Sequence, residues 1–162
     1  NMVSSLLCAK GWLQSYTNII SYSDIIYSSD IIKKLIESKE DISITYDVNW
    51  LNLWKLRFED PLSDAETFKI DKNKKLIKKK KKPKCISEIQ GQYMGLLKFT
   101  PRGWYKIEEY LSRLTQEEIN KMSMTTLLNN LINSKIDIYG IPIQEQWYEI
   151  DTESDLKLYE NL

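Results

Sequence analysis

The stretch "NIISYSDIIYSSDIIKKLIESKEDISITYD", residues 18–47, holds three secondary-structure patterns in succession. An apolar, β-branched run predicts a strand near 18–23. A serine or Asp30 can then cap a helix that carries four apolar residues on one face. The alternating "DISITYD" at 41–47 predicts the next strand, and the residues before this stretch predict a helix over about 2–14. Helix, strand, helix and strand in this order predict an α/β fold with a largely parallel sheet.

The segment at about 48–84 interrupts this alternation. Its tryptophan-rich first part, which ends near Pro61, is expected to be a covering segment or loop and not part of the sheet. A hairpin follows, with Phe68 and Ile70 in one strand, a turn at residues 71–73, and Leu76 and Ile77 in the other. The sequence thus predicts a hairpin and cover segment beside the main sheet.

The rest of the chain returns to alternating strands and helices. "GQYMGLLKFT" at 91–100 predicts a central strand, and Pro101 permits a helix to start. Thr115 and Glu118 have the spacing of a capping box for a short helix, and "TTLLNNLINS" predicts another. "IDIYGIPI" and "WYEI" predict two strands, and Thr152 caps a last helix.

Composition limits the classes of function. The 162 residues suit one domain, and their formal net charge of zero gives no general attraction to nucleic acid or anionic membranes. No apolar run approaches the roughly 18–20 residues of a membrane span. Two isolated cysteines, Cys8 and Cys85, fit a reduced, cytoplasmic chain better than a disulfide scaffold. The absence of histidine excludes Ser-His-Asp and Cys-His catalysis, so chemistry must rest on carboxylates, lysines, hydroxyls or a hard metal such as Mg²⁺.

A basic stretch from Lys72 to Lys84 has two interpretations. It is either a patch that binds phosphate or nucleic acid, or a solvated hairpin edge that lysines protect from pairing. No aromatic residue lies within the run of lysines, which argues against a groove for nucleic acid. We therefore expect no nucleic-acid partner.

Two carboxylates lie where predicted strands end. Asp24 follows "IISYS", and Asp151 follows "WYEI" just before the last helix. In parallel α/β sheets, ligands bind beyond the carboxyl ends of the strands. Two such carboxylates can share one Mg²⁺, which leaves its other positions to water and phosphate. Either residue alone is as well explained as a turn former or a helix-terminal acid.

Three segments, "NMVSSL" with "SDIIYS", "EIQGQYMGLLKFTPRGW" and "WYEIDTESDL", resemble nucleotidyltransferases of the sugar-nucleotide pyrophosphorylase type. The likeness runs along nearly the whole chain and is closest to phosphocholine cytidylyltransferase-like enzymes. It implies a Rossmann-like nucleotidyltransferase sheet with flanking helices, spanning residues 1–162 as the C-terminal part of a single domain. It also implies transfer of a nucleoside monophosphate from CTP or another NTP to a phosphorylated or phosphonate small molecule, for surface-polysaccharide or lipid-headgroup modification. In this family Mg²⁺ lies between aspartates that match Asp24 and Asp151.

Two departures from the family pattern bear on activity. The family's G-x-G-x-R loop does not occur, because the five glycines stand isolated at 11, 91, 95, 103 and 140. The likeness begins partway into the family pattern, at Asn1, so we expect a fold incomplete at its N-terminus and a fragment inactive by itself. Serine at position 23 replaces a frequent glycine, which requires a negative φ there. The alternative is a truncated, non-catalytic relative that acts as an interaction module.

The acceptor site is expected to use aromatic and polar side chains. Aromatic faces attract cationic head groups, and a carboxylate can supply a counter-charge. Core packing and edge-strand polarity are the competing explanations for the same residues. The predicted substrate-binding residues are Trp50, Trp54, Glu88, Gln90, Trp147 and Glu149.

Overall fold

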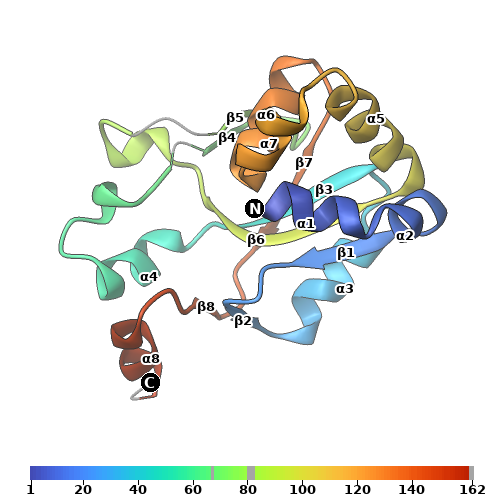
Figure 1. Cartoon of the computed structure of the whole chain (residues 1–162). Helices are drawn as coiled ribbons and strands as arrows, with labels where there is room; N and C mark the ends of the chain where they lie inside the picture. Colours follow the sequence, from blue (N-terminus) through green and yellow to red (C-terminus); the bar gives the residue numbers. More distant parts are fainter. Residues whose placement is uncertain (67, 80–82, 161–162) are drawn as a thin grey trace.

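A four-stranded sheet forms the centre of the molecule, in the order β1-β6-β3-β7 (Figure 1). The computed structural model describes residues 1–66, 68–79 and 83–160. No helix within these ranges is long and apolar enough to cross a membrane. The four strands are β1 (Asn18–Ser21), β3 (Ile42–Asp47), β6 (Gln92–Phe99) and β7 (Tyr139–Ile143).

The sheet is mixed, and less parallel than the sequence predicts. β3 and β7 are parallel, whereas β6 runs antiparallel to both of its neighbours, β1 and β3. The pairing of Asp47 with Gln92 explains this direction, because the long segment after β3 brings the chain back to the end where β3 finishes. The expectation that β6 is an internal strand is confirmed.

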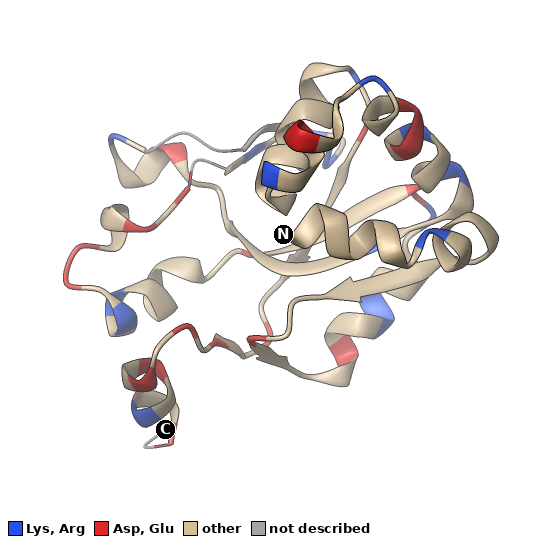
Figure 2. Ribbon diagram, in the orientation of Figure 1, with Lys and Arg blue, Asp and Glu red and all other residues tan. Residues whose placement is uncertain are grey.

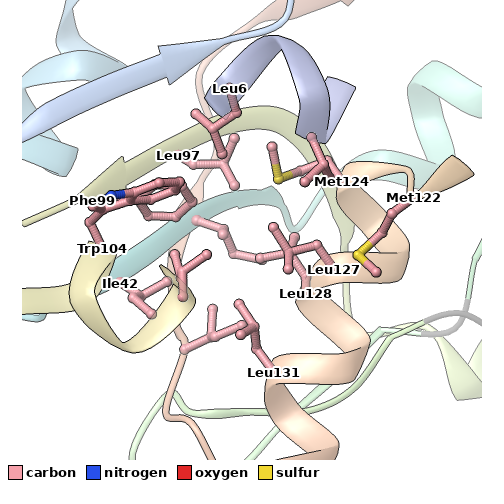
Figure 3. Packing of buried hydrophobic residues seen from close by; sticks show 14 of the residues in the cluster. Leu6, Ile42, Leu97, Phe99, Trp104, Met122, Met124, Leu127, Leu128 and Leu131 are labelled. Atoms are coloured by element: carbon pink, nitrogen blue, oxygen red, sulfur yellow. The ribbon is translucent and has the colours of Figure 1, made fainter. Parts of the chain in front are cut away.

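Five helices cover one face of the sheet (Figure 1). Side chains from these helices and from alternate strand positions form the larger apolar core, where Trp104 lies beside Phe99 and Leu128 beside Leu127 (Figure 3). Alternation along β6 sends Leu97 and Phe99 to this core and Leu96 to the opposite one. The helices are α1 (Met2–Cys8), α2 (Lys10–Ser15), α5 (Pro101–Leu111), α6 (Gln116–Lys121) and α7 (Met124–Asn133).

Local sequence explains how several helices begin. The predicted capping box of Thr115 and Glu118 forms at α6, and Thr100 caps α5 directly before Pro101. The helix expected over 2–14 is two helices, because Ala9, with φ −91° and ψ 10°, separates α1 from α2.

A second apolar core lies on the other face of the sheet, against α3 (Ser29–Glu37) and α4 (Trp50–Arg57). Ile31 and Leu35 supply the buried face of α3, as the spacing of its apolar residues predicts. α4 belongs to the segment expected to be cover or loop, and its tryptophans fold as a helix because they pack into this core.

The predicted hairpin is confirmed in β4 (Phe68–Ile70) and β5 (Leu76–Lys79). Its turn places Lys74 in the left-handed region, with φ 63°. Two 3₁₀ turns, η1 (Pro61–Ser63) and η2 (Ile86–Glu88), flank this part of the chain. Residues 80–82 of the basic stretch lie outside the described residues, so both interpretations of that stretch stay predictions.

A short two-stranded ribbon pairs a segment from the first third of the chain with a segment near its C-terminal end. β2 (Ile25–Tyr27) pairs antiparallel with β8 (Trp147–Glu149), and α8 (Glu153–Tyr159) follows directly. Thr152 and Asp155 form a second capping box at the start of α8. The ribbon therefore holds the N-terminal third of the chain against the C-terminal end, at one edge of the molecule (Figure 1).

Candidate functional site

The β2–β8 ribbon brings together the two chain segments that carry the carboxylates singled out by the sequence. Ile25 pairs with Glu149, so one step further along the ribbon Asp24 meets the end of β8. The Ile150 backbone N–H donates a hydrogen bond to the Asp24 carbonyl over 2.8 Å. The Asp24 backbone therefore faces Ile150, the residue before Asp151, although Asp24 and Asp151 are 127 positions apart in the sequence.

Asp24 lies in an exposed turn and not at the end of a buried strand as expected. β1 ends at Ser21, and residues 22–24 carry the chain from β1 to β2. Just beyond the strand, the Tyr22 N–H still donates to the Gly95 carbonyl, at a residue of β6 with a positive φ of 83°. Ser23 is not among the left-handed residues of the described chain, which satisfies the condition that a serine at this position needs.

Asp151 is held by an arginine that the sequence did not single out. The Arg57 Nη2 donates to Asp151 Oδ2 over 2.7 Å, and its Nη1 donates to Glu149 Oε2 over 2.6 Å. The Arg57 Nε donates to Asp155 Oδ1 over 2.9 Å. We call these four side chains the Arg57 cluster, in which one guanidinium faces three carboxylates.

Burial and hydrogen bonding set the charges in this cluster. Burial would lower the pKa of Arg57, but hydrogen bonds from the guanidinium to Asp155, Asp151 and Glu149 raise it, so the side chain stays charged. Burial raises the pKa of Glu149, against the opposing effect of Arg57. Burial would also raise the pKa of Asp155, but the bonds from Arg57 and Thr152 hold it below its ordinary value. Acidic segments surround the ribbon and the start of α8 in Figure 2, beside the basic end of α4.

The donor set fits one hard divalent ion shared with a ligand, and not a closed protein cage. The described residues contain no group of three or more His, Cys, Asp or Glu that could hold a metal. Mg²⁺ needs only one or two protein carboxylates when phosphate and water complete its coordination. Asp24 is exposed, and Asp151 has one oxygen on Arg57 while its side chain is 51% exposed. These two carboxylates are thus suited to such an ion.

A small cavity of about 180 Å³ opens beside the ribbon. Its wall includes Tyr22, which lies two positions before Asp24, and Glu149, which lies two positions before Asp151. The rings of Tyr22 and Tyr93 meet edge to face at 5.9 Å, and burial raises the pKa of Tyr22 to about 12. The cavity is lined by Tyr22, Trp54, Asp64, Glu66, Gln92, Tyr93, Gly95, Thr125 and Glu149.

A glycine shapes this cavity. A side chain on Gly95 would place its Cβ 2.7 Å from the Tyr22 ring, and the positive φ of this residue would strain any L side chain. Gly95 therefore lets Tyr22 lie against β6, where the ring forms part of the cavity wall.

Four of the six predicted substrate-binding residues lie at the small cavity or in the second core. Trp54 and Glu149 line the small cavity. Trp50 and Trp147 are buried in the second core, where the Trp147 Nε1–H donates to Asp47 Oδ2 over 3.1 Å. Their role in binding substrate stays a prediction beside this packing role.

Two other predicted residues, Glu88 and Gln90, lie near η2 and the hairpin. Glu88 Oε2 accepts a hydrogen bond from the Lys84 N–H over 2.9 Å, and Gln90 Oε1 accepts one from the Ile70 N–H over 2.7 Å. Both side chains tie loop backbone to the fold, and their substrate-binding role also stays a prediction.

A larger cleft of about 720 Å³ lies on the other side of Tyr22. Asp24 is one of the residues that line this cleft. Most of the cleft wall is apolar and comes from α1, α2 and β1. Tyr22 lines both this cleft and the small cavity, so the turn that carries Asp24 separates the two hollows.

Arg57, Tyr22, Asp64 and Glu66 escaped the sequence analysis because no local pattern marks them. Arg57 ends a helix whose last turn is basic, which is ordinary for a helix C-terminus. The position of Arg57 between Trp54 and Phe58 is the sequence feature that could have revealed its role. A cation among aromatic residues is expected to be buried only together with anionic partners.

The chain is similar to a curated relative along nearly its whole length. It is 36% identical to a CTP:phosphoglutamine cytidylyltransferase from Campylobacter jejuni, over 98% of this chain and 66% of that relative. The chain thus spans just under two thirds of the relative's length. No protein-family model matches the chain.

Two solved structures share its fold at low identity. The inositol-1-phosphate CTP transferase of T. maritima has a TM-score of 0.71 and 16% identity, over 97% of this chain and 59% of that one. A Bacillus anthracis protein assigned as a glucose-1-phosphate thymidylyltransferase has a TM-score of 0.70 and 16% identity, over 97% and 58%. The expected Rossmann-like nucleotidyltransferase fold is confirmed.

Proposed function

Because this chain is a relative of the cytidylyltransferases and has a nucleotidyltransferase fold, we propose that the intact protein transfers CMP from CTP to a phosphorylated small molecule. Pyrophosphate is the other product. The observation that carries this proposal is the β2–β8 ribbon, which brings the backbone of Asp24 to Ile150, the residue before Asp151.

The reaction needs charge control more than proton transfer. An oxygen of the acceptor's phosphate attacks the α-phosphorus of CTP, and the bond from that phosphorus to the pyrophosphate oxygen breaks. The nucleophile is already an anion, so the chain requires no histidine to activate it. Asp24 and Asp151 would hold Mg²⁺, which neutralises phosphate charge when bound. The remaining contribution of the protein is in-line positioning of the two anions.

The small cavity is our candidate for the acceptor's organic part. Three carboxylates, from Asp64, Glu66 and Glu149, line it together with the aromatic residues Tyr22, Trp54 and Tyr93. Such walls favour a cationic group such as an ammonium, since each cation–π contact contributes about 0.5–2 kcal/mol. The Campylobacter relative is named for phosphoglutamine, a phosphorylated amino-acid derivative. We expect the product to serve surface-polysaccharide or lipid-headgroup modification, and the two free cysteines favour a cytoplasmic enzyme.

Replacement of Asp24 by asparagine in the intact protein tests the proposal. Asp24→Asn should lower turnover of CTP about 10²–10³-fold, because a bound metal contributes several kcal/mol of charge stabilisation. The thermal midpoint should stay unchanged, since Asp24 is exposed. Asp30→Asn is the matched control, as Asp30 is also exposed and, within the described part of the chain, its side chain bonds to Lys33 alone. Normal pyrophosphate release by the Asp24 variant would remove the metal-site assignment.

We also propose that the 162-residue chain by itself has little transferase activity. Its five glycines are isolated, so it contains no glycine-rich loop to cradle a triphosphate. The same observation supports the alternative function, a non-catalytic interaction module. Pyrophosphate release from CTP and phosphoglutamine by the isolated chain would contradict the inactivity. Failure of the intact protein to release pyrophosphate with any phosphorylated acceptor tried would favour the module.

A further inference from the structure

We propose that Arg57 is a positioning residue that fixes the Asp151 carboxylate for metal binding. This inference rests on the proposed function and deepens it. Arg57 holds Asp151 Oδ2 over 2.7 Å, and Asp151 Oδ1 accepts no hydrogen bond among the described residues. One oxygen is thus fixed to the protein, while the other stays available to a ligand.

The guanidinium is suited to this role because it is itself immobile. Its side chain is only 1% exposed, and its central carbon lies 5.6 Å from the centre of the Trp54 ring and 5.1 Å from that of Phe58. A planar fork with three occupied donors cannot rotate without breaking several bonds. Asp151 is therefore attached to a rigid point in the second core.

Asp155 fixes the same residue from a second direction. Its Oδ1 accepts from Arg57 Nε, and its Oδ2 accepts from the Asp151 N–H over 3.2 Å. Oδ2 also accepts from the Thr152 N–H over 2.9 Å, as part of the α8 capping box. The side chain of Asp151 is thus held by Arg57 and its backbone by Asp155, and these two holders bind each other.

Exposure separates the three carboxylates by role. The Asp155 side chain is 9% exposed and is used in capping, and the Glu149 side chain is 22% exposed and lines the small cavity. The Asp151 side chain is 51% exposed. Asp151 is therefore the member of the Arg57 cluster that is both held by arginine and open to solvent, beside Asp24.

The charge balance supports the same role. One guanidinium among three carboxylates leaves the Arg57 cluster with an excess of two negative charges, before Asp24 is counted. A divalent cation at Asp24 and Asp151 would reduce this excess. Without Arg57, the carboxylates would repel one another, and Asp151 would leave its position beside the ribbon.

The test is direct binding of Mn²⁺, used as a probe, to the intact protein. Free Mn²⁺ is measured by electron paramagnetic resonance in the presence of a CTP analogue with a non-hydrolysable α,β-bridge. Arg57→Met should weaken Mn²⁺ binding about 10–100-fold, the usual effect of losing a group that orients a metal ligand. Arg57→Lys keeps the charge but not the fork, so it should give a smaller loss and only partial rescue.

Two further variants make the result interpretable. Arg102→Met is the matched control, because Arg102 is an arginine that also binds a carboxylate, Asp41, outside the Arg57 cluster. It should leave Mn²⁺ binding unchanged. Asp155→Asn keeps an oxygen for the cap but weakens the bond to Arg57, and it should weaken binding by a lesser factor. This variant decides the matter if the Arg57 variants do not fold, as judged by circular dichroism.

Each outcome supports or overturns the inference. Folded Arg57 variants that bind Mn²⁺ as tightly as the wild type would overturn it, and so would an unchanged Asp155→Asn if the Arg57 variants are unfolded. Failure of the proposed function would give a different result. In that case the wild-type protein would bind no Mn²⁺, or Asp24→Asn would bind it as tightly as the wild type. The two failures are thus distinguishable with the same measurement.

Discussion

Two clusters of charged side chains lie at opposite ends of β3, and they differ in the ratio of cations to carboxylates. At the start of the strand, one carboxylate, Asp41, meets two cations, Arg102 at 2.8 Å and Lys106 at 2.9 Å. Beyond the other end, the Arg57 cluster places one cation among three carboxylates. The first arrangement satisfies its central anion, whereas the second leaves anionic capacity unused.

The neighbours of each cluster agree with this difference. Asp41 also accepts from the Thr100 hydroxyl, and its carbonyl accepts from the Thr100 N–H, so it anchors the residue that caps α5. At Gly103 a Cβ would lie 2.3 Å from the Asp41 carbonyl oxygen, so helix and strand are as close as they can be. The Arg57 cluster borders an acidic cavity and an exposed turn instead. An ion-pair cluster with no free carboxylate stabilises the fold, and one with an exposed carboxylate is a candidate binding site.

The sharpest test of this comparison is Asp151→Asn in the intact protein. We expect turnover to fall about 10²–10³-fold, because a metal-binding carboxylate is lost. The free energy of unfolding should change by no more than about 1 kcal/mol, since Asp151 is half exposed. Urea unfolding and pyrophosphate release measure the two quantities. A large loss of stability with normal turnover would make the Arg57 cluster structural, like the Asp41 cluster.

Asp41→Ala should have the converse effect. We expect it to lower the free energy of unfolding by about 1–3 kcal/mol, the usual contribution of hydrogen bonds to a charged group. Turnover per folded molecule should not change. Asp137→Ala is the matched control, because Asp137 pairs with Lys75 in a more exposed position, with side chains 55% and 36% exposed, and should cost under about 1 kcal/mol. A turnover defect in Asp41→Ala would contradict the division of roles.

The smallest expected effect is on the pH dependence of stability. Burial would raise the pKa of Asp41, but hydrogen bonds from Lys106, Arg102 and Thr100 lower it to about 2, from an ordinary 3.8. Since the folded-state pKa is the lower one, the contribution of Asp41 is complete above about pH 4 and is lost as pH falls toward 2. Unfolding in urea at pH 5 and pH 3 should therefore show a smaller difference in Asp41→Ala than in the wild type. Equal differences would mean that Asp41 does not have this low pKa.

Most elements of the fold could be predicted from local sequence. Apolar spacing and caps located α3 and α6, and alternation with a turn located the β4–β5 hairpin. The direction of β6 could not be predicted, because it depends on where the long segment after β3 returns the chain. The helical structure of α4, which was expected to be cover or loop, could not be predicted. This helix is stabilised by packing of its tryptophans in the second core, and its sequence has no helical periodicity that would reveal it.

The candidate site was predicted in part. Asp24 and Asp151 were proposed from strand ends and family likeness, and the structure places their backbone segments side by side, with Asp24 opposite Ile150. Arg57 was missed because its three partners lie more than 90 positions away in the sequence. The predicted tryptophans Trp50, Trp54 and Trp147 all lie in the second core, and Trp54 also reaches the small cavity. Sequence cannot distinguish these cases, since both environments favour large aromatic side chains.

The sequence alone determined the chemistry that this protein can use. The lack of histidine leaves carboxylates, lysines and hydroxyls as candidate functional groups, and the five isolated glycines form no glycine-rich phosphate loop within residues 1–162. Only the tertiary structure decided which carboxylates are satisfied and which remain available, at Asp41 and Asp151 respectively. The physical reason is that local sequence fixes propensity and side-chain type. The charge that a carboxylate can offer to a ligand depends on partners and burial that distant segments provide.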